Sequence, residues 1–242
     1  MLATLVGISV TAPLMLVSAA LAAASVVGVP VVSCRAELGA PGAAPPRSPA
    51  KLAIAVDARD SNRVRFYSDG FVTVLAPKGW SCAGLEAADG SQSLSVFPAG
   101  QPDPAKGEPL PARAAGVTAL LDYTGHGPGA ELVCGLFPGT QAATFAGETG
   151  GCPPVPSREQ VTRPTADVAT FFDPAGVRGS GVPSGGKNAA VGVVLFPQLT
   201  PEPGSVNVAK TTCTAPASLS SVCALVVADF VARDGSAQQP TG

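Results

Sequence analysis

The chain has 242 residues, with 15 Lys and Arg against 17 Asp and Glu, which gives a formal net charge of −2. Charged residues make up only 13% of it and form no basic stripe, so nucleic acid is not expected as a partner. The single histidine, His126, and the lack of a C-x-x-C motif argue against a metal site, and no cofactor is predicted.

The first 33 residues contain no charged side chain and are mostly apolar. A secretory signal peptide needs an apolar stretch of roughly 7–15 residues before a small-residue cleavage site, and a membrane span needs about 20. The Ala20-Leu21-Ala22 triplet has the A-x-A pattern that signal peptidase reads. Residues 1–33 are therefore predicted to be a signal peptide or a membrane anchor, although no Lys or Arg precedes the apolar stretch.

A second processing site lies at Val31-Val32-Ser33-Cys34, which resembles the lipobox of bacterial lipoproteins. That resemblance implies acylation of Cys34, which would then be the mature N-terminus. Residues 34–50 are rich in Pro, Ala and Gly, and this composition predicts a linker between a membrane and a folded domain. An uncleaved anchor helix is a third alternative, against which Pro13 and Pro30 argue.

Short apolar runs separated by turn residues follow the linker. Strands are predicted at Leu52–Val56, within Val64–Pro77 and at Leu94–Phe97. The Asp69-Gly70 dipeptide, which stands between β-branched and aromatic residues, predicts a hairpin, and Asp89-Gly90 predicts a second turn.

The middle of the chain has a mixed pattern. The apolar spacing over Ala112–Tyr123 predicts a helix, whereas Glu131–Phe137 and Ala166–Phe172 are strand-like. A capping-box pattern, Ser157 with Gln160, predicts a short helix between them.

The last third of the chain predicts one buried strand and one helix. Ala189–Phe196 is a continuous apolar run. Ser218 or Ser220 is a suitable N-cap for a helix that ends at Gly235. Residues 236–242 are predicted to be a disordered tail.

These elements predict one compact α+β domain over residues 51–235. It would consist of antiparallel strands and hairpins with two or three helices, stapled by disulfides. About 190 residues remain after the signal and linker, which is enough for one domain with a core of its own.

Six cysteines support export, because thiols pair in oxidising compartments and each disulfide stabilises by about 2–4 kcal/mol. They lie at positions 34, 82, 134, 152, 213 and 223. Cys213–Cys223 is predicted because it closes a short loop between a strand-like run and a helix. Cys134–Cys152 is the second predicted pair.

The fate of Cys34 decides that of Cys82. If Cys34 is acylated, five thiols remain and Cys82 is left unpaired. If Cys34 stays in a mature soluble protein, Cys34–Cys82 becomes a third disulfide. Lipidation of Cys34 is the preferred interpretation, and the cysteine count argues mildly against it.

From Phe71 onward the chain resembles a family of uncharacterised secreted actinobacterial proteins. The resemblance implies export and transfers no catalytic residue. The segments that carry it are Ala76–Cys82, Asp89-Gly90-Ser91, Cys152-Pro153-Pro154, Phe172–Gly186, and Thr212-Cys213-Thr214 with Cys223.

The stretch GSGVPSGGKN, residues 179–188, matches two catalytic patterns. Gly181 to Lys187 has the phosphate-loop spacing, and Ser184 to Lys187 has the S-x-x-K of penicillin-recognising serine enzymes. Asn188 replaces the hydroxyl that binds magnesium in a phosphate loop, and a strand rather than a helix is predicted next. Neither pattern therefore predicts an activity, and Ser184 and Lys187 are kept as a candidate binding loop.

Other catalytic candidates carry no distinctive spacing. His126 stands in GHGPG, which predicts an exposed loop, and Asp57 with Asp60 resembles a solvated turn. We therefore predict an exported cell-envelope protein, tethered at the membrane through its N-terminus, that is a non-enzymatic module binding an envelope protein or a small molecule. No nucleotide is expected as a ligand. The alternative is an extracytoplasmic hydrolase with a serine or carboxylate mechanism.

Overall fold

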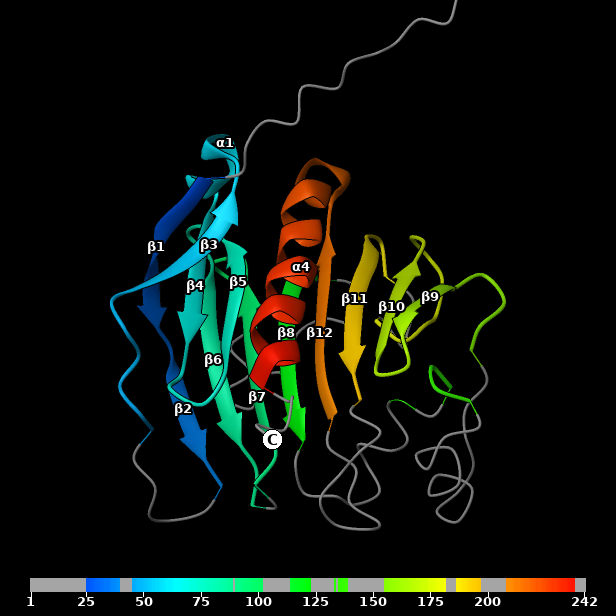
Figure 1. Cartoon of the computed structure of the whole chain (residues 1–242), viewed down its shortest axis with the longest axis horizontal. Coiled ribbons are helices and arrows are strands. Elements are labelled where there is room, and N and C mark those ends of the chain that lie inside the picture. The colour runs from blue at the N-terminus through cyan, green and yellow to red at the C-terminus, as the bar shows by residue number, and fades with distance from the viewer. Residues whose placement is uncertain are drawn as a thin grey trace, which may run out of the picture.

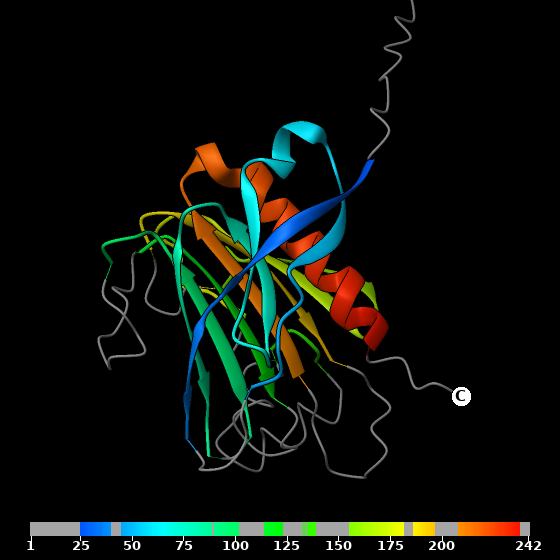
Figure 2. The same cartoon turned by 90° about the vertical axis from the view of Figure 1, so that its left-hand side faces the viewer.

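The computed structural model describes residues 25–39, 45–88, 90–101, 114–122, 133, 135–138, 155–181, 186–196 and 208–237. Two β-sheets form separate layers, and a long C-terminal helix lies beside the smaller sheet on one face of the larger (Figures 1 and 2). In the described part of the chain there are twelve strands and one helix of 18 residues. The predicted α+β class is therefore wrong, because the protein is mostly β.

The smaller sheet has the strand order β3-β1-β4-β5. Its strands are β1 (Ser25–Ser33), β3 (Lys51–Val56), β4 (Val64–Ser68) and β5 (Thr73–Pro77). Strand β1 pairs antiparallel with β3 and parallel with β4. A four-residue helix, α1 (Ala58–Ser61), joins β3 to β4.

The larger sheet has the strand order β2-β6-β7-β8-β12-β11-β10-β9. All its neighbouring strands are antiparallel except the parallel pair β2 and β6. Its strands are β2 (Arg35–Leu38), β6 (Ser81–Glu86), β7 (Gln92–Phe97), β8 (Gly116–Asp122), β9 (Gln160–Thr165), β10 (Val168–Asp173), β11 (Ala189–Leu195) and β12 (Val208–Ala215).

The hairpin predicted at Asp69-Gly70 joins β4 to β5. Gly70 has a φ of 97°, a conformation that a glycine adopts without strain. The Oδ1 atom of Asp69 accepts hydrogen bonds from the backbone N–H groups of Phe71 (2.9 Å) and Val72 (2.7 Å). The local sequence therefore encodes this turn, as expected for an Asp-Gly hairpin.

The helix predicted at Ala112–Tyr123 is wrong, because Gly116–Asp122 forms strand β8. Val117, Ala119 and Leu121 are buried, whereas Thr118 between them is exposed. Alternation with period two is the pattern of a strand, but apolar Leu120 obscures it in the sequence. Pairing with β7 and β12 on either side decides the conformation.

Two shorter predictions in the middle of the chain are also wrong. Ser157 lies in a turn, and Gln160 begins β9, so the capping-box pattern starts no helix. Within Glu131–Phe137, the described residues form a helical turn instead of a strand. There, the N–H groups of Leu136 and Phe137 donate to the carbonyl of Val133.

The predicted N-terminal boundaries are wrong as well. Strand β1 lies within the segment interpreted as a signal or anchor, and β2 lies within the segment interpreted as a linker. Val29 of β1 is only 2% exposed, because β1 lies between β3 and β4 and faces the core. Ser48 donates to Ser68 in β4 over 2.8 Å, so the end of the predicted linker packs on the domain. The folded domain therefore begins at or before Ser25.

The sulfur of Cys34 is bonded to Cys82. One sulfur cannot carry both a disulfide and an acyl-bearing thioether, so the interpretation of Cys34 as a lipidation site is corrected to a disulfide. This is the alternative that the cysteine count favoured.

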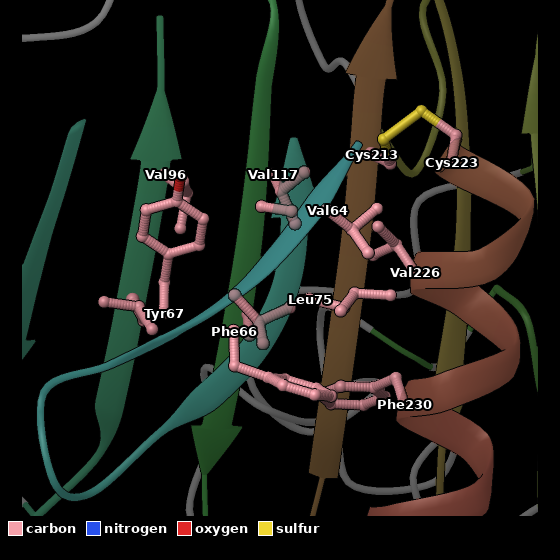
Figure 3. Close-up of a cluster of buried hydrophobic side chains, with 14 of the residues drawn as sticks. Val64, Phe66, Tyr67, Leu75, Val96, Val117, Cys213, Cys223, Val226 and Phe230 are labelled. Atoms are coloured by element: carbon pink, nitrogen blue, oxygen red, sulfur yellow. A yellow bond between two sulfur atoms is a disulfide. The ribbon is translucent and has the colours of Figure 1, made fainter. Parts of the chain in front are cut away.

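The main core lies between the two sheets and helix α4 (Ser220–Ala237). The helix was predicted, but it continues through Gly235, so two residues of the predicted tail are helical. Its buried face includes Val222. Figure 3 shows Val226 and Phe230 of the same face, which point toward the strands. A short 3-10 helix, η2 (Ala217–Leu219), connects β12 to α4.

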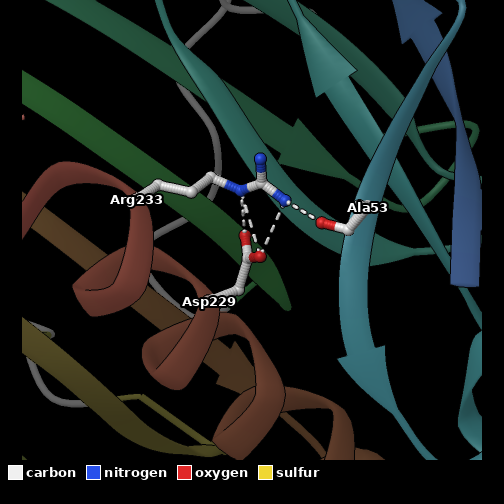
Figure 4. A network of polar contacts seen from close by, with 3 residues as sticks. All are labelled: Ala53, Asp229 and Arg233. Carbon is white, nitrogen blue, oxygen red and sulfur yellow. Dashed lines mark hydrogen bonds and ion pairs between the residues drawn. The ribbon is translucent and has the colours of Figure 1, made fainter. Parts of the chain in front are cut away.

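A polar contact fixes the C-terminal half of α4 to the smaller sheet. Arg233 Nη2 donates to Asp229 Oδ1 (2.9 Å) and to the carbonyl oxygen of Ala53 in β3 (3.1 Å), as Figure 4 shows. The guanidinium carbon of Arg233 lies 4.2 Å from the centre of the Phe66 ring. Cation–π stacking and the ion pair together offset the burial of Asp229.

Asp234, next to this contact, should make stability depend on pH. Burial raises the pKa of Asp234 to about 6, the charge of Asp229 adds to the rise, and Arg233 opposes it. Because the folded protein holds this proton more tightly than the unfolded chain, stability should fall as the pH rises from about 4 to 6 and then stay level.

Asp234→Asn removes the cost of holding an ionised carboxylate at this partly buried position. It should raise the free energy of unfolding at pH 7 by about 1–2 kcal/mol, after allowance for the solvent that reaches the side chain. Urea titrations at pH 4 and pH 7 test this, with exposed Asp57→Asn as the control. An equal gain at both pH values would contradict the expectation.

No helix in the described part of the chain is long and apolar enough to cross a membrane.

Candidate functional site

A pocket of about 510 Å³ lies between the start of α4 and the larger sheet. Its floor is a row of three cross-strand neighbours, Phe172 in β10, Val191 in β11 and Cys213 in β12. The N-terminal turns of the helical segment cover it, through Ala217, Ser220, Cys223 and Ala224.

The pocket exists because the helix does not cover the whole sheet and because the facing side chains are small. Helix α4 packs on β11, β12 and β5. Phe172 in β10 lies beyond this cover and is 39% exposed, which is unusual for so large an apolar side chain. Alanine supplies much of the remaining lining, and it leaves space that larger residues fill in an ordinary helix–sheet interface. These alanines are 175, 189, 190, 215, 217 and 224.

Three polar residues join this apolar lining. Lys187 and Asn188 precede β11, and Ser220 begins α4. Because Ala189 pairs with Ala215, Asn188 and the residues after β12 lie at the same end of the strands. Lys187 is exposed. The pocket therefore has one end with hydrogen-bonding groups and an apolar floor.

The structure places Lys187 of the predicted binding loop at this pocket, whereas Ser184 lies outside the described residues. The N–H of Gly176 donates to the carbonyl of Gly186 over 2.7 Å and closes the base of the loop. The loop runs from the end of β10 to the start of β11, as predicted for a connection between two strands.

Two carboxylates hold the first part of the loop. The N–H of Ser180 donates to Glu159 Oε1 (3.0 Å), and the N–H of Gly181 donates to Asp173 Oδ2 (2.7 Å). A Cβ atom on Gly179 would collide with the Asp173 carboxylate, so the close approach requires glycine there. The glycine content that resembles a phosphate loop therefore has a structural cause in this protein.

This geometry differs from a working phosphate loop. In such a loop the backbone amides point at phosphate oxygens and a helix follows. Here the amides of Ser180 and Gly181 are bonded to protein carboxylates, and strand β11 follows. The distance between Ser184 and Lys187, which would test the S-x-x-K pattern, lies outside the described residues.

Lys210 forms a charge cluster with Asp173 and Glu159 on the face of the sheet opposite to α4. Its Nζ donates to the carbonyl of Ser180 (2.6 Å) and lies 5.6 Å from the centre of the Phe171 ring. Burial lowers the pKa of Lys210, while the charges of Asp173 and Glu159 act in the opposite direction. The cluster thus fixes the loop from one face of the sheet, and the loop presents Lys187 on the other.

The remaining candidates have other roles or lie elsewhere. The predicted Cys213–Cys223 disulfide is present, and both of its cysteines line the pocket. Cys134, Cys152 and His126 lie outside the described residues. Of the acidic pair, Asp57 is exposed before α1, and Asp60 forms an ion pair with Arg63 over 3.0 Å.

The sequence missed most residues of the site. The pocket floor of Phe172, Val191 and Cys213 forms only through strand pairing. The same holds for the contact of Lys210 with the loop on the opposite face. One signal in the sequence could have indicated the pocket. Alanines recur in the strand and helix segments that face each other, where larger apolar residues usually pack.

The described residues contain no group of three or more His, Cys, Asp or Glu side chains placed to hold a metal ion. Comparisons with protein-family models, curated proteins and solved structures found no match for this chain.

Proposed function

We propose that this is an exported binding protein that holds a small apolar ligand between α4 and the larger sheet. The pocket carries the proposal, because a volume of about 510 Å³ with an apolar lining and few polar groups is typical of small-molecule sites. Phe172 adds an aromatic surface that is exposed without a ligand and would be covered by one.

Export is supported by two features. The disulfides Cys34–Cys82 and Cys213–Cys223 are compatible with an oxidising, extracytoplasmic compartment. The uncharged N-terminal segment has the composition of a signal. The predicted similarity to secreted actinobacterial proteins agrees with this proposal.

Of the two processing sites, we favour Ala20-Leu21-Ala22. Cleavage after Ala22 keeps all of β1, whereas cleavage before Cys34 removes it. A cleaved protein would be released into the cell envelope or beyond. If the segment stays uncleaved, it would tether the domain to the outer face of the membrane.

Binding is preferred over hydrolysis because of the chemistry of the lining. The pocket is apolar over most of its surface, and the described residues that line it include no carboxylate. A serine mechanism at the pocket would use Ser220, and the described lining includes no histidine or carboxylate to activate it. We therefore propose no second function.

A neutral alkyl probe tests the proposal. We expect 1-decanol to bind the folded protein with one-to-one stoichiometry in isothermal titration calorimetry. Each buried methylene contributes about 0.8 kcal/mol, so octanol should bind more weakly, by roughly fourfold per methylene lost.

A substitution that fills the pocket should block this binding. Ala224→Leu adds three carbons at the wall and should weaken decanol binding by about 15–60-fold, because two or three methylenes of the ligand can no longer be buried. Ala224 is exposed and helical, so leucine is expected to leave the fold intact.

Ala228→Leu is the matched control, since Ala228 is also exposed on α4 and lines a different pocket. Equal binding by Ala224→Leu and Ala228→Leu would place the site elsewhere. No binding of decanol by the unmodified protein would overturn the proposed function.

A further inference from the structure

We infer that the ligand of this pocket is a single-chain amphiphile with a carboxylate head, a free fatty acid in chemical class. The inference rests on the proposed function and names its substrate class. It is carried by the separation of polar and apolar lining and by the charge at the polar end.

The polar groups gather at one end of the pocket. Lys187 and Asn188 stand directly before Ala189, which pairs with Ala215 at the end of β12. Ser220 follows a few residues later, at the start of α4. An ammonium, an amide and a hydroxyl are all hydrogen-bond donors that an anionic head can use.

The larger apolar side chains lie two residues further along β11, beyond the small residues Ala189 and Ala215. Val191 lies between Phe172 and Cys213 in the cross-strand row that forms the floor. An alkyl chain whose head lies near Lys187 can therefore extend over this row and cover Phe172. The exposed aromatic ring and the polar end are thus explained by one molecule.

The charge of the polar end favours an anion. Among the described residues that line the pocket, Lys187 carries the one formal charge. The first turn of α4 contains no acidic residue that would offset the partial positive charge of the helix N-terminus. The ion pair of Arg63 with Asp60, which contacts Ser221, adds no net charge there. The field at this end is therefore positive.

A single lysine suits a carboxylate better than a phosphate. Lysine is a point charge, and a carboxylate carries one negative charge to match it. A phosphate monoester carries about two negative charges at pH 7, so one lysine would leave part of its charge unmatched. The structure therefore favours the carboxylate among anionic amphiphiles.

The test compares ligands that share a tail and differ in the head. Decanoate, 1-decanol and decyl phosphate are titrated calorimetrically into the full folded domain and into two variants. Lys187→Gln removes the charge at the pocket, and Lys78→Gln removes the charge of another exposed lysine, which does not line the pocket.

We expect Lys187→Gln to weaken decanoate binding by about 3–5-fold, the size of a partly solvated ion pair, and to leave decanol binding unchanged. Lys78→Gln should change neither. The preference for decanoate should also shrink as salt is added.

The outcomes separate the two proposals. If decanol and decanoate both bind and Lys187→Gln affects them equally, the carboxylate inference is overturned and the proposed function stands. If decyl phosphate binds more tightly than decanoate through Lys187, the head is a phosphate and the inference is again overturned. If no alkyl probe binds, the proposed function itself fails.

Discussion

A chain that starts at Cys34 should not fold, whereas a chain that starts at Ala23 should. The longer chain keeps strand β1, and the shorter one keeps the Cys34–Cys82 disulfide but loses the strand. Without β1, strands β3 and β4 lose their shared neighbour, and Val29 no longer fills the core. Circular dichroism and thermal unfolding of the two purified chains measure the difference.

The expected loss is comparable to the whole stability of a domain. Burial of one valine contributes about 1.5–3 kcal/mol, and Val27 and Val31 of β1 pack against the same core as Val29. A domain of this size has only about 5–15 kcal/mol in total.

Cys34→Ser in the longer chain is the matched control. It keeps β1 and should cost only the disulfide, about 2–4 kcal/mol, so that variant should still unfold cooperatively. Cooperative unfolding of the Cys34-initiated chain at a similar temperature would show that β1 is dispensable. Processing of the lipoprotein type would then be compatible with the fold.

Lys210→Met should destabilise the protein by about 2–4 kcal/mol. The substitution keeps the length of the side chain but removes the cation near Asp173 and Glu159, which are 1% and 8% exposed. Removal of one partner from a buried charge cluster is costly, because the remaining charges stay desolvated. The carbonyl of Ser180 also loses its donor. Urea unfolding measures the change.

Lys51→Met is the control for lysine replacement on a strand, because Lys51 is exposed in β3, and it should change stability by less than about 0.5 kcal/mol. Asp173→Asn added to Lys210→Met removes one of the uncompensated charges and should recover part of the loss. If Lys210→Met is as stable as Lys51→Met, the cluster does not hold the loop.

Features that depend on neighbouring residues were predictable from the sequence. The Asp69-Gly70 hairpin follows from turn chemistry, strand β11 from its apolar run, and helix α4 from its periodicity. The Cys213–Cys223 disulfide follows because the two residues are close in the chain. In each of these the information lies within about 20 residues.

The predictions from sequence were wrong where the tertiary environment of a segment determines its conformation or its location. Strand β8 has helical spacing in isolation, but pairing on both sides makes it a strand. The apolar residues of β1 have the composition of a signal segment, and only β3 and β4 show that they belong to the domain. An apolar composition shows that a segment is unfavourable in water. It does not show whether the segment is buried in a protein core or in a membrane.

The sequence by itself determined the turns, the C-terminal helix, the short-range disulfide and the glycine-rich loop that carries Lys187. Only the tertiary structure decided that Cys34 meets Cys82 and that Lys187 borders a pocket floored by Phe172. The reason is that cross-strand neighbours are set by register between segments far apart in the chain. A pocket exists only where such segments meet and leave space unfilled.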